Sequence, residues 1–468
     1  MITSGSEKTA RIGTRSVRTI VLLPLFFLYW AYGGQARPGL RVGRESNHTV
    51  FEVMEEVARL ESLPLWPGFV PHAVPTALFD GKSTYLFNYP HKPEGFLPLD
   101  GRPDAYILDG RHLAVFGNRR TMLENVWIAT SILNANTSAT GRPFTIREIA
   151  ALVLHEQFHV FQAFRHPDWL PNDLALFDYP LDSVESLRLR IAEVEGFSRA
   201  VTAGGRNDAA GWAAAALEIR RKRLSGLPVK HARYESELQR LEGTAEYVEY
   251  LAGGRGVMDG PRAAGIAPRA ARELGYQEGR WLAVLLDQLD PGWKDAWESG
   301  EFEYLEDRLK NAVREFSGMK SFTPAELLAM AAEAEQSLRK SEEERIKLSR
   351  TVKSTIGNKI EIVAVNRPLE LQNFDPFNIE ALNETEMLHK EWLVLKNERG
   401  AVEVFHQPCL TEINQDSQII RLTIPGLFSR IRAFRRGGKV TAKMEGITAV
   451  FEGARLSMRG KNIVIKLE

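Results

Sequence analysis

The segment Leu152 to Gln162, LVLHEQFHVFQ, carries two histidines four residues apart, with a glutamate directly after the first. In a helix, residues with this spacing lie on one face, so His155 and His159 can bind the same metal ion. Zinc binds neutral imidazole readily, and a catalytic zinc has three protein ligands and one open position. Glu156 lies about a third of a turn away, where it can reach a metal-bound water as a general base. The pattern predicts a catalytic zinc site; the alternative is a half-buried helix with two histidines.

The third zinc ligand must come from another part of the chain. A third histidine on the same segment would follow a glycine at 162 and stand at 165, but the sequence has Gln162 and Arg165. The segment 239–251, QRLEGTAEYVEYL, places Glu242 and Glu246 on one helical face. We expect Glu242 to bind zinc and Glu246 to accept the N–H of a ligating histidine, which fixes the imidazole tautomer. The alternative is a solvated acidic stripe.

HExxH followed by EGTAEY resembles the gluzincin metallopeptidases, especially the aminopeptidase-N-like and glycyl-aminopeptidase-like groups. The resemblance implies a zincin-like fold, with Glu242 as third ligand and Glu246 bonded to a ligand histidine. It also implies a tyrosine that stabilises the tetrahedral intermediate, for which Tyr276 is the candidate. The strand VWIATSIL (126–133) would be the edge strand that pairs with the substrate backbone. The chain departs from these groups in its long insert before Glu242 and in RTMLENVW (120–127), which lacks the glycine of their G-x-M-E-N exopeptidase motif.

Helical periodicity and helix-start signals indicate the elements that hold these residues. Thr145 and Glu148 form a predicted capping box at the start of the metal-binding helix. Further helices are expected at about 181–203, 207–224, 229–252, 268–289, 301–316 and 324–348. Segments with alternating β-branched residues follow from about 355 onward and predict short strands.

The predicted fold class is therefore α+β, in three regions. Residues 37–144 form an N-terminal α/β region that contributes a sheet to the catalytic domain. Residues 145–350 form a mainly helical, zinc-binding and zincin-like catalytic domain. Residues 355–468 form a small antiparallel β domain.

Composition and the N-terminus restrict the class of protein. Sixty basic and sixty acidic residues give a formal charge of zero, which argues against a nucleic-acid binder. The basic run RRKR (Arg220 to Arg223) is expected to be the solvated last turn of a helix. Residues 1–36 place an apolar run after several basic residues, which is typical of a signal peptide or an uncleaved signal anchor. The protein is thus expected to be periplasmic, extracellular or anchored, with membrane contact only through this segment.

These features predict an exported zinc-dependent metallopeptidase with one Zn²⁺ per chain and a peptide or protein substrate. His155, His159 and Glu242 would bind the metal, Glu156 would act as general base, and Tyr276 would stabilise the oxyanion. The competing interpretation is a non-catalytic binding protein of the cell envelope with a degenerate or structural HExxH site. A structural site is closed by a fourth protein ligand, and the sequence offers no Cys or His at a plausible spacing. This favours the enzyme.

Overall fold

The computed structural model describes residues 49–109, 119–124, 126–133, 144–176, 179–180, 183–253, 256, 271–316, 318–355, 358–376, 378–383, 385–414, 416, 418–426, 432–459 and 462–467. The predicted signal peptide or anchor, residues 1–36, lies outside this part of the chain. Within it, none of the helices combines the length and the apolar character that a membrane span requires.

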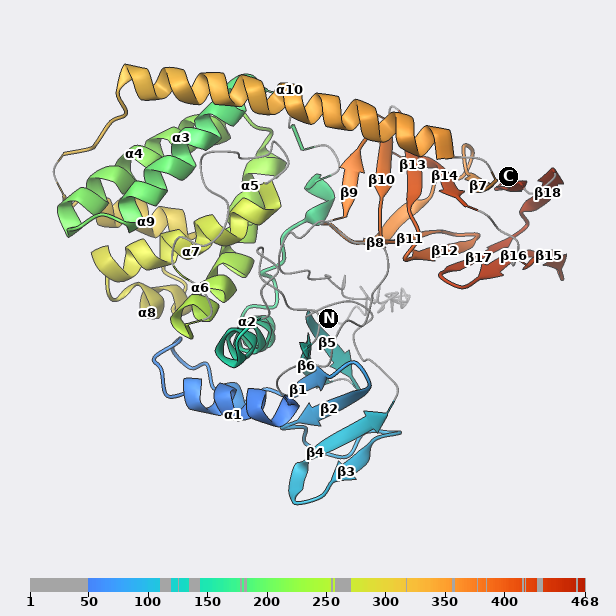
Figure 1. Ribbon diagram of the computed structural model, residues 1–468, viewed down its shortest axis with the longest axis horizontal. Coiled ribbons are helices and arrows are strands. Elements are labelled where there is room, and N and C mark those ends of the chain that lie inside the picture. Colours follow the sequence, from blue (N-terminus) through green and yellow to red (C-terminus); the bar gives the residue numbers. More distant parts are fainter. Residues whose placement is uncertain are drawn as a thin grey trace, which may run out of the picture.

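The fold is mixed α+β, and its elements follow one another as three regions along the chain. Figure 1 shows the N-terminal sheet with α1 beside it, then a group of helices, then the C-terminal strands. The last helix, α10 (Pro324–Thr355), runs along one side of the molecule from the helices to the strands. The predicted α+β class is confirmed.

The N-terminal sheet has the strand order β3-β4-β2-β1-β6-β5. Its strands are β1 (Thr76–Phe79), β2 (Ser83–Phe87), β3 (Leu97–Leu99), β4 (Arg102–Asp109), β5 (Arg119–Leu123) and β6 (Val126–Ile132). The expectation that the strand before the metal-binding helix is an edge strand is wrong. The strand β6 pairs with β1 in parallel on one side and with β5 as a hairpin on the other, so β5 occupies the edge. The sequence around β6 could not indicate this, because β1 comes from a distant segment.

The helix α1 (Val50–Leu60) opens with a capping box between Thr49 and Glu52. Its apolar residues recur every three or four positions, which buries one face. That face belongs to the same hydrophobic core as the sheet and the central helices, and this core includes buried residues from Val50 to Ala334. The N-terminal region and the helical region are therefore packed as one body.

The central helices lie close to the predicted positions. They are α2 (Ile146–Arg165), α3 (Val184–Val201), α4 (Arg206–Ser225), α5 (Val229–Leu238), α6 (Thr244–Leu251), α7 (Ala271–Leu289), α8 (Trp293–Glu298) and α9 (Leu305–Val313). Short 3-10 turns, η1 (Pro71–Ala73) and η3 (Asp173–Leu176), precede α2 and α3. The single helix expected over 229–252 is interrupted by a π-helical turn, η4 (Gln239–Gly243). The short α8 was not predicted.

The basic run at the end of α4 is not a solvated turn, so that prediction is wrong. Arg220 and Arg223 are only 1% and 2% exposed, whereas Arg221 and Lys222 between them face solvent. The two buried guanidinium groups belong to a network with Arg190 that joins five helices. Its carboxylates are Glu193, Glu235, Glu278 and Glu306. Local sequence could not show this, because the glutamates come from α3, α5, α7 and α9.

Two sheets form the C-terminal region and share one hydrophobic core. One has the order β18-β19-β7-β14-β13-β10-β9, and the other β15-β16-β17-β12-β11-β8. The strands are β7 (Lys359–Val363), β8 (Glu370–Phe374), β9 (Ile379–Ala381), β10 (Glu386–His389), β11 (Trp392–Asn397), β12 (Gly400–Phe405), β13 (Cys409–Ile413), β14 (Ile419–Pro425), β15 (Arg432–Arg436), β16 (Lys439–Met444), β17 (Ile447–Glu452), β18 (Arg455–Arg459) and β19 (Asn462–Lys466). The described pairings are antiparallel except that of β7 with β19, which is parallel.

Both ends of α10 are held by other parts of the molecule. Near its start, Glu326 accepts a hydrogen bond of 2.7 Å from Arg199 of α3. Near its end, Leu348 and Val352 pack against a small apolar cluster of the C-terminal sheet, and Lys353 pairs with Glu386 at 2.7 Å. The helix is longer than the predicted 324–348, because its last turns rest on this sheet.

Candidate metal centre

The helix α2 carries both histidines through the interior of the molecule. It begins at the predicted capping box, in which the Thr145 hydroxyl accepts from the Glu148 backbone N–H and the Glu148 carboxylate accepts from Thr145. Every residue from Ile149 to Val160 is buried, including His155, Glu156 and His159. A histidine pair in such a place must find polar partners, because an unsatisfied buried polar group is costly.

The three predicted ligands converge on one point. His155, His159 and Glu242 each offer a ligand atom, and these atoms all lie within 4.8 Å of one another. The Nε2 atoms of the two histidines are 3.2 Å apart, and His159 Nε2 lies 2.9 Å from Glu242 Oε2. Two imidazole nitrogens and one carboxylate oxygen suit zinc, so this buried group could hold a metal ion.

Glu242 is placed by the π-helical turn η4, which leads directly into α6. Such turns are rare and occur often at functional sites. The glycine that follows Glu242 is required by close packing against α7. A Cβ on Gly243 would lie 2.4 Å from the Cα of Gly279, so neither position has room for a side chain. The backbone next to Glu242 is thus in direct contact with the backbone of α7.

Gln162 connects the histidine helix to the turn that carries Glu242. Its Oε1 lies 2.7 Å from His159 Nδ1, while its Nε2 donates to the Leu241 carbonyl and to the Thr244 hydroxyl, both at 2.8 Å. Since the amide N–H₂ faces these two acceptors, Oε1 accepts the proton of Nδ1. This leaves the Nε2 lone pair of His159 directed to the site. Sequence analysis missed this role, although Gln162 stands one helical turn after His159.

Replacing Gln162 by methionine is expected to lower the zinc affinity 10- to 100-fold, because His159 loses the acceptor that fixes its tautomer. Competition against a chromophoric chelator would measure the affinity. Gln162→Glu is the matched variant, since its carboxylate keeps the acceptor for Nδ1 and should retain more of the affinity. Equal affinities in the methionine variant and the wild type would contradict this role.

Two carboxylates, those of Glu246 and Glu249, lie beside His155. His155 Nδ1 lies 3.1 Å from Glu249 Oε2. Glu246 is close by, since it forms a second group with His155 and Glu249 in which the ligand atoms lie within 4.8 Å. However, Arg280 of α7 faces Glu246 and donates a hydrogen bond of 3.1 Å to it. The acidic residues of α6 therefore interact with a buried histidine and a buried arginine, and they do not form a solvated stripe.

Burial raises the pKa values of the carboxyl groups at the site, although the buried Arg272 and Arg280 oppose the rise. Burial raises the pKa of Glu242 to about 8 and that of Glu249 to about 8. Burial and the neighbouring Glu249 raise the pKa of Glu246 to about 7. Burial lowers the pKa of His155 to about 4, so its imidazole is neutral, as metal binding requires. A divalent cation would add positive charge beside these carboxylates, and this fits a metal site.

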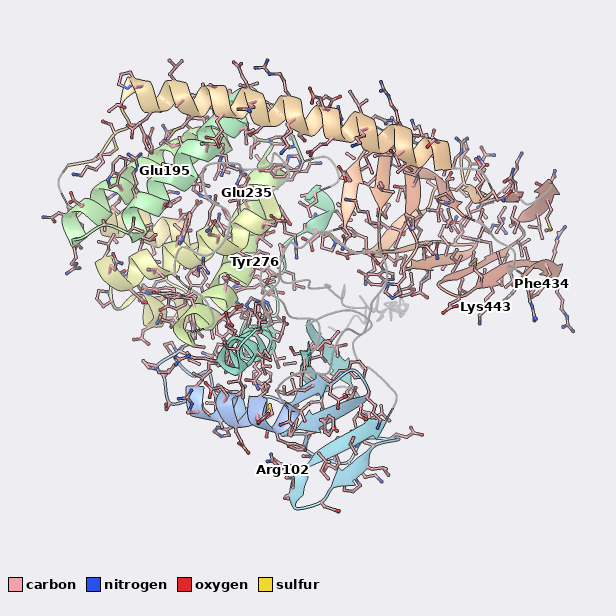
Figure 2. The ribbon with its side chains drawn as sticks, viewed as in Figure 1. Arg102, Glu195, Glu235, Tyr276, Phe434 and Lys443 are labelled. Carbon is pink, nitrogen blue, oxygen red and sulfur yellow. The ribbon has the colours of Figure 1, made fainter. Side chains whose placement is uncertain are left out.

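Tyr276 lies beside Glu242, in the second turn of α7 and toward the middle of the molecule (Figure 2). Its buried hydroxyl interacts with the Glu242 carboxylate and counteracts the rise in the pKa of that group. Burial raises the pKa of Tyr276 itself well above its ordinary value, so the phenol stays neutral and can donate. Its role as an oxyanion stabiliser stays a prediction.

Arg272, one turn before Tyr276, lies 3.8 Å from Glu242 Oε1. Its guanidinium pairs with Asp173 and donates to the Tyr234 hydroxyl at 3.1 Å. Sequence analysis missed Arg272 and Arg280. The signal was present, because Arg272, Tyr276 and Arg280 recur every four residues and so mark one face of α7.

Comparison with known proteins gives no assignment: no family model, curated protein or solved structure matches this chain.

Proposed function

We propose that this chain is an exported zinc-dependent metallopeptidase with a zincin-like, gluzincin-type catalytic region. The observation that carries the proposal is the convergence of His155, His159 and Glu242 in a buried site on α2 and η4. Glu156, which directly follows the first histidine, is buried on the same helix. The pattern of residues 1–36 supports export.

The residues of the site have distinct roles in this proposal. His155, His159 and Glu242 would hold the metal, with Gln162 and Glu249 orienting the two imidazoles. When bound, zinc would supply a nucleophilic water at neutral pH and polarise the scissile carbonyl. Glu156 would take the proton of the attacking water and pass it to the leaving amine. The Tyr276 hydroxyl would donate to the developing oxyanion.

A peptide or protein is the proposed substrate. The support is the resemblance of HExxH and EGTAEY to peptidases, together with the position of β5. Among the described strands, β5 is the edge of the N-terminal sheet, and it contacts α2. Its free edge in this part of the chain would pair with the backbone of an incoming peptide. Among the described residues, the two groups able to hold a metal share His155, and neither includes a cysteine. This favours an open catalytic site over a closed structural one.

The test is the metal content of the purified protein beside that of Glu242→Ala. We expect about one zinc per chain in the wild type and a sharp fall in the variant, measured by mass spectrometry after purification without chelators. Glu335→Ala, which removes an exposed carboxylate of α10, is the control and should keep its zinc. Zinc-loaded protein would then be screened against a peptide mixture. A wild type that binds no zinc even after reloading would overturn the proposal in favour of a binding protein.

A further inference from the structure

The hairpin β15–β16 is a strongly basic surface feature of the C-terminal region. Residues 432–444, RAFRRGGKVTAKM, contain five arginines and lysines and no acidic residue. The hairpin forms the edge of its sheet. Figure 2 shows two of its residues, Phe434 and Lys443, at the end of the molecule remote from Tyr276. This surface is therefore separate from the candidate metal centre.

The strand register gathers four of the cations on one face. Arg432 is opposite Lys443, and Arg436 is opposite Lys439. Because side chains alternate between the two faces of a strand, these four residues share a face with Phe434, which lies between the two pairs. The other face carries Val440 and Ala442, which are buried in the core of the region. The cations thus frame an aromatic side chain on the outward face.

This arrangement is unfavourable for the isolated protein. Like charges directly opposite one another across two strands repel. Lys439 has a partner in Glu452, at 2.9 Å. For Arg432, Arg436 and Lys443 no ion pair is formed with any residue in the described part of the chain. An anionic partner would remove the repulsion.

An apolar row crosses the same face. Phe434 is 48% exposed, and Val450 of β17, which is 36% exposed, lies opposite Thr441 in the same register row. Acidic residues on the adjoining strands, Glu452 on β17 and Glu403 on β12, limit the positive area to the hairpin. A short patch of cations around an exposed aromatic suits lipid headgroups, which attract the cations while the ring enters the apolar boundary.

We propose that the outward face of β15–β16 docks on an anionic phospholipid surface. Arg432, Arg436 and Lys443 bind the headgroup phosphates, and Phe434 enters the boundary with the acyl chains. A nucleic acid is the less favoured partner, because proteins that bind one need a longer positively charged groove along the nucleic-acid backbone. The net charge of this protein is also zero. The predicted N-terminal apolar segment would also bring the protein to a membrane.

The first experiment compares vesicle binding of the purified protein, as isolated from the expressing cells, with that of two charge-matched double variants. The variant Arg432→Gln with Lys443→Gln is expected to bind phosphatidylserine-containing vesicles about 25-fold more weakly, since each basic residue near the surface contributes about five-fold. The control is Arg339→Gln with Lys340→Gln on exposed α10, which should bind as the wild type does. Any contribution of the N-terminal segment is common to all three proteins. Thermal unfolding followed by circular dichroism checks that the variants fold.

The second experiment asks whether the hairpin itself meets the lipid. Phe434→Cys is labelled with a polarity-sensitive fluorophore; Cys409, which is 1% exposed, stays unlabelled. The emission should shift to the blue on vesicles with phosphatidylserine and not on phosphatidylcholine alone. A label at Leu328→Cys on α10, where the side chain is 72% exposed, should show no shift.

Equal losses in the two double variants, or an unchanged emission at position 434 on anionic vesicles, would overturn the proposal. The proposal would also be overturned if the protein does not bind the vesicles but binds a labelled single-stranded oligonucleotide in a way that depends on the hairpin residues. That last result would assign the surface to nucleic acid.

Discussion

Replacing Glu156 by glutamine is expected to lower the rate of peptide cleavage by a factor of 10² to 10⁴ while the protein keeps its zinc. Glutamine has nearly the same shape as glutamate but cannot accept a proton, and general-base catalysis contributes a factor of this size. The metal should stay, because Glu156 is not one of the three residues whose ligand atoms converge. The measurement is kcat on a peptide found by the screen, together with the zinc content of the same sample.

The control for this prediction is Glu335→Gln, which removes an exposed carboxylate of α10 and should cleave at the wild-type rate. A Glu156→Gln protein that cleaves as fast as the wild type would rule out the general-base role. If the variant loses its zinc, Glu156 belongs to the binding of the metal instead. The two measurements separate these results.

Replacing Arg223 by methionine is expected to reduce the free energy of unfolding by about 3–5 kcal/mol, the usual effect of removing one partner of a buried ion pair. Arg223 donates to Glu193 at 2.6 and 3.1 Å and to Glu235 at 2.8 and 2.9 Å. Burial raises the pKa of Glu235, but Arg190 and Arg223 outweigh it and hold this pKa far below its ordinary range. Without Arg223, the negative charges of Glu193 and Glu235 stay buried with much less positive charge beside them.

Urea unfolding followed by tryptophan fluorescence would measure this loss, since Trp392 is the only tryptophan beyond residue 355 and the signal reports mainly on the helical region. The matched control is Arg221→Met, two residues away. Arg221 is exposed and pairs only with the exposed Glu218 at 2.6 Å in the described structure, so its loss should leave the urea midpoint unchanged. The same midpoint in both variants would mean that the buried network contributes little to stability.

Much of the candidate site could be predicted from sequence because it depends on local spacing. Two histidines four apart meet on one face of any helix, and the capping box at Thr145 fixes where that helix begins. The place of Glu242 beside the two histidines could be predicted because the HExxH segment lacks a third ligand of its own and the acidic segment 239–251 can supply one. These inferences need only the period of a helix and the coordination chemistry of zinc.

The parts that sequence analysis missed depend on which elements pack together. Arg280 donates a hydrogen bond to Glu246, and Glu249 lies beside His155; no spacing within α6 can indicate these two contacts. The run RRKR is compatible with the solvated end of a helix or with a buried network. Two of its arginines are buried here because glutamates from other helices pair with them. Likewise, β6 is internal only because β1 pairs with it from a segment about fifty residues earlier.

The helix α10 has a consequence for the geometry of the whole molecule. It is uninterrupted over 32 residues, which corresponds to a length of about 48 Å at 1.5 Å per residue. Its two ends contact different regions of the molecule. The rotation of one region relative to the other about the helix axis therefore depends on the number of residues between the two contacts. One inserted residue would rotate the C-terminal sheets about the helix axis by about 100°, whereas four would leave a net rotation of about 40°. The number of residues in α10 therefore determines the direction in which the β15–β16 face points relative to the metal centre.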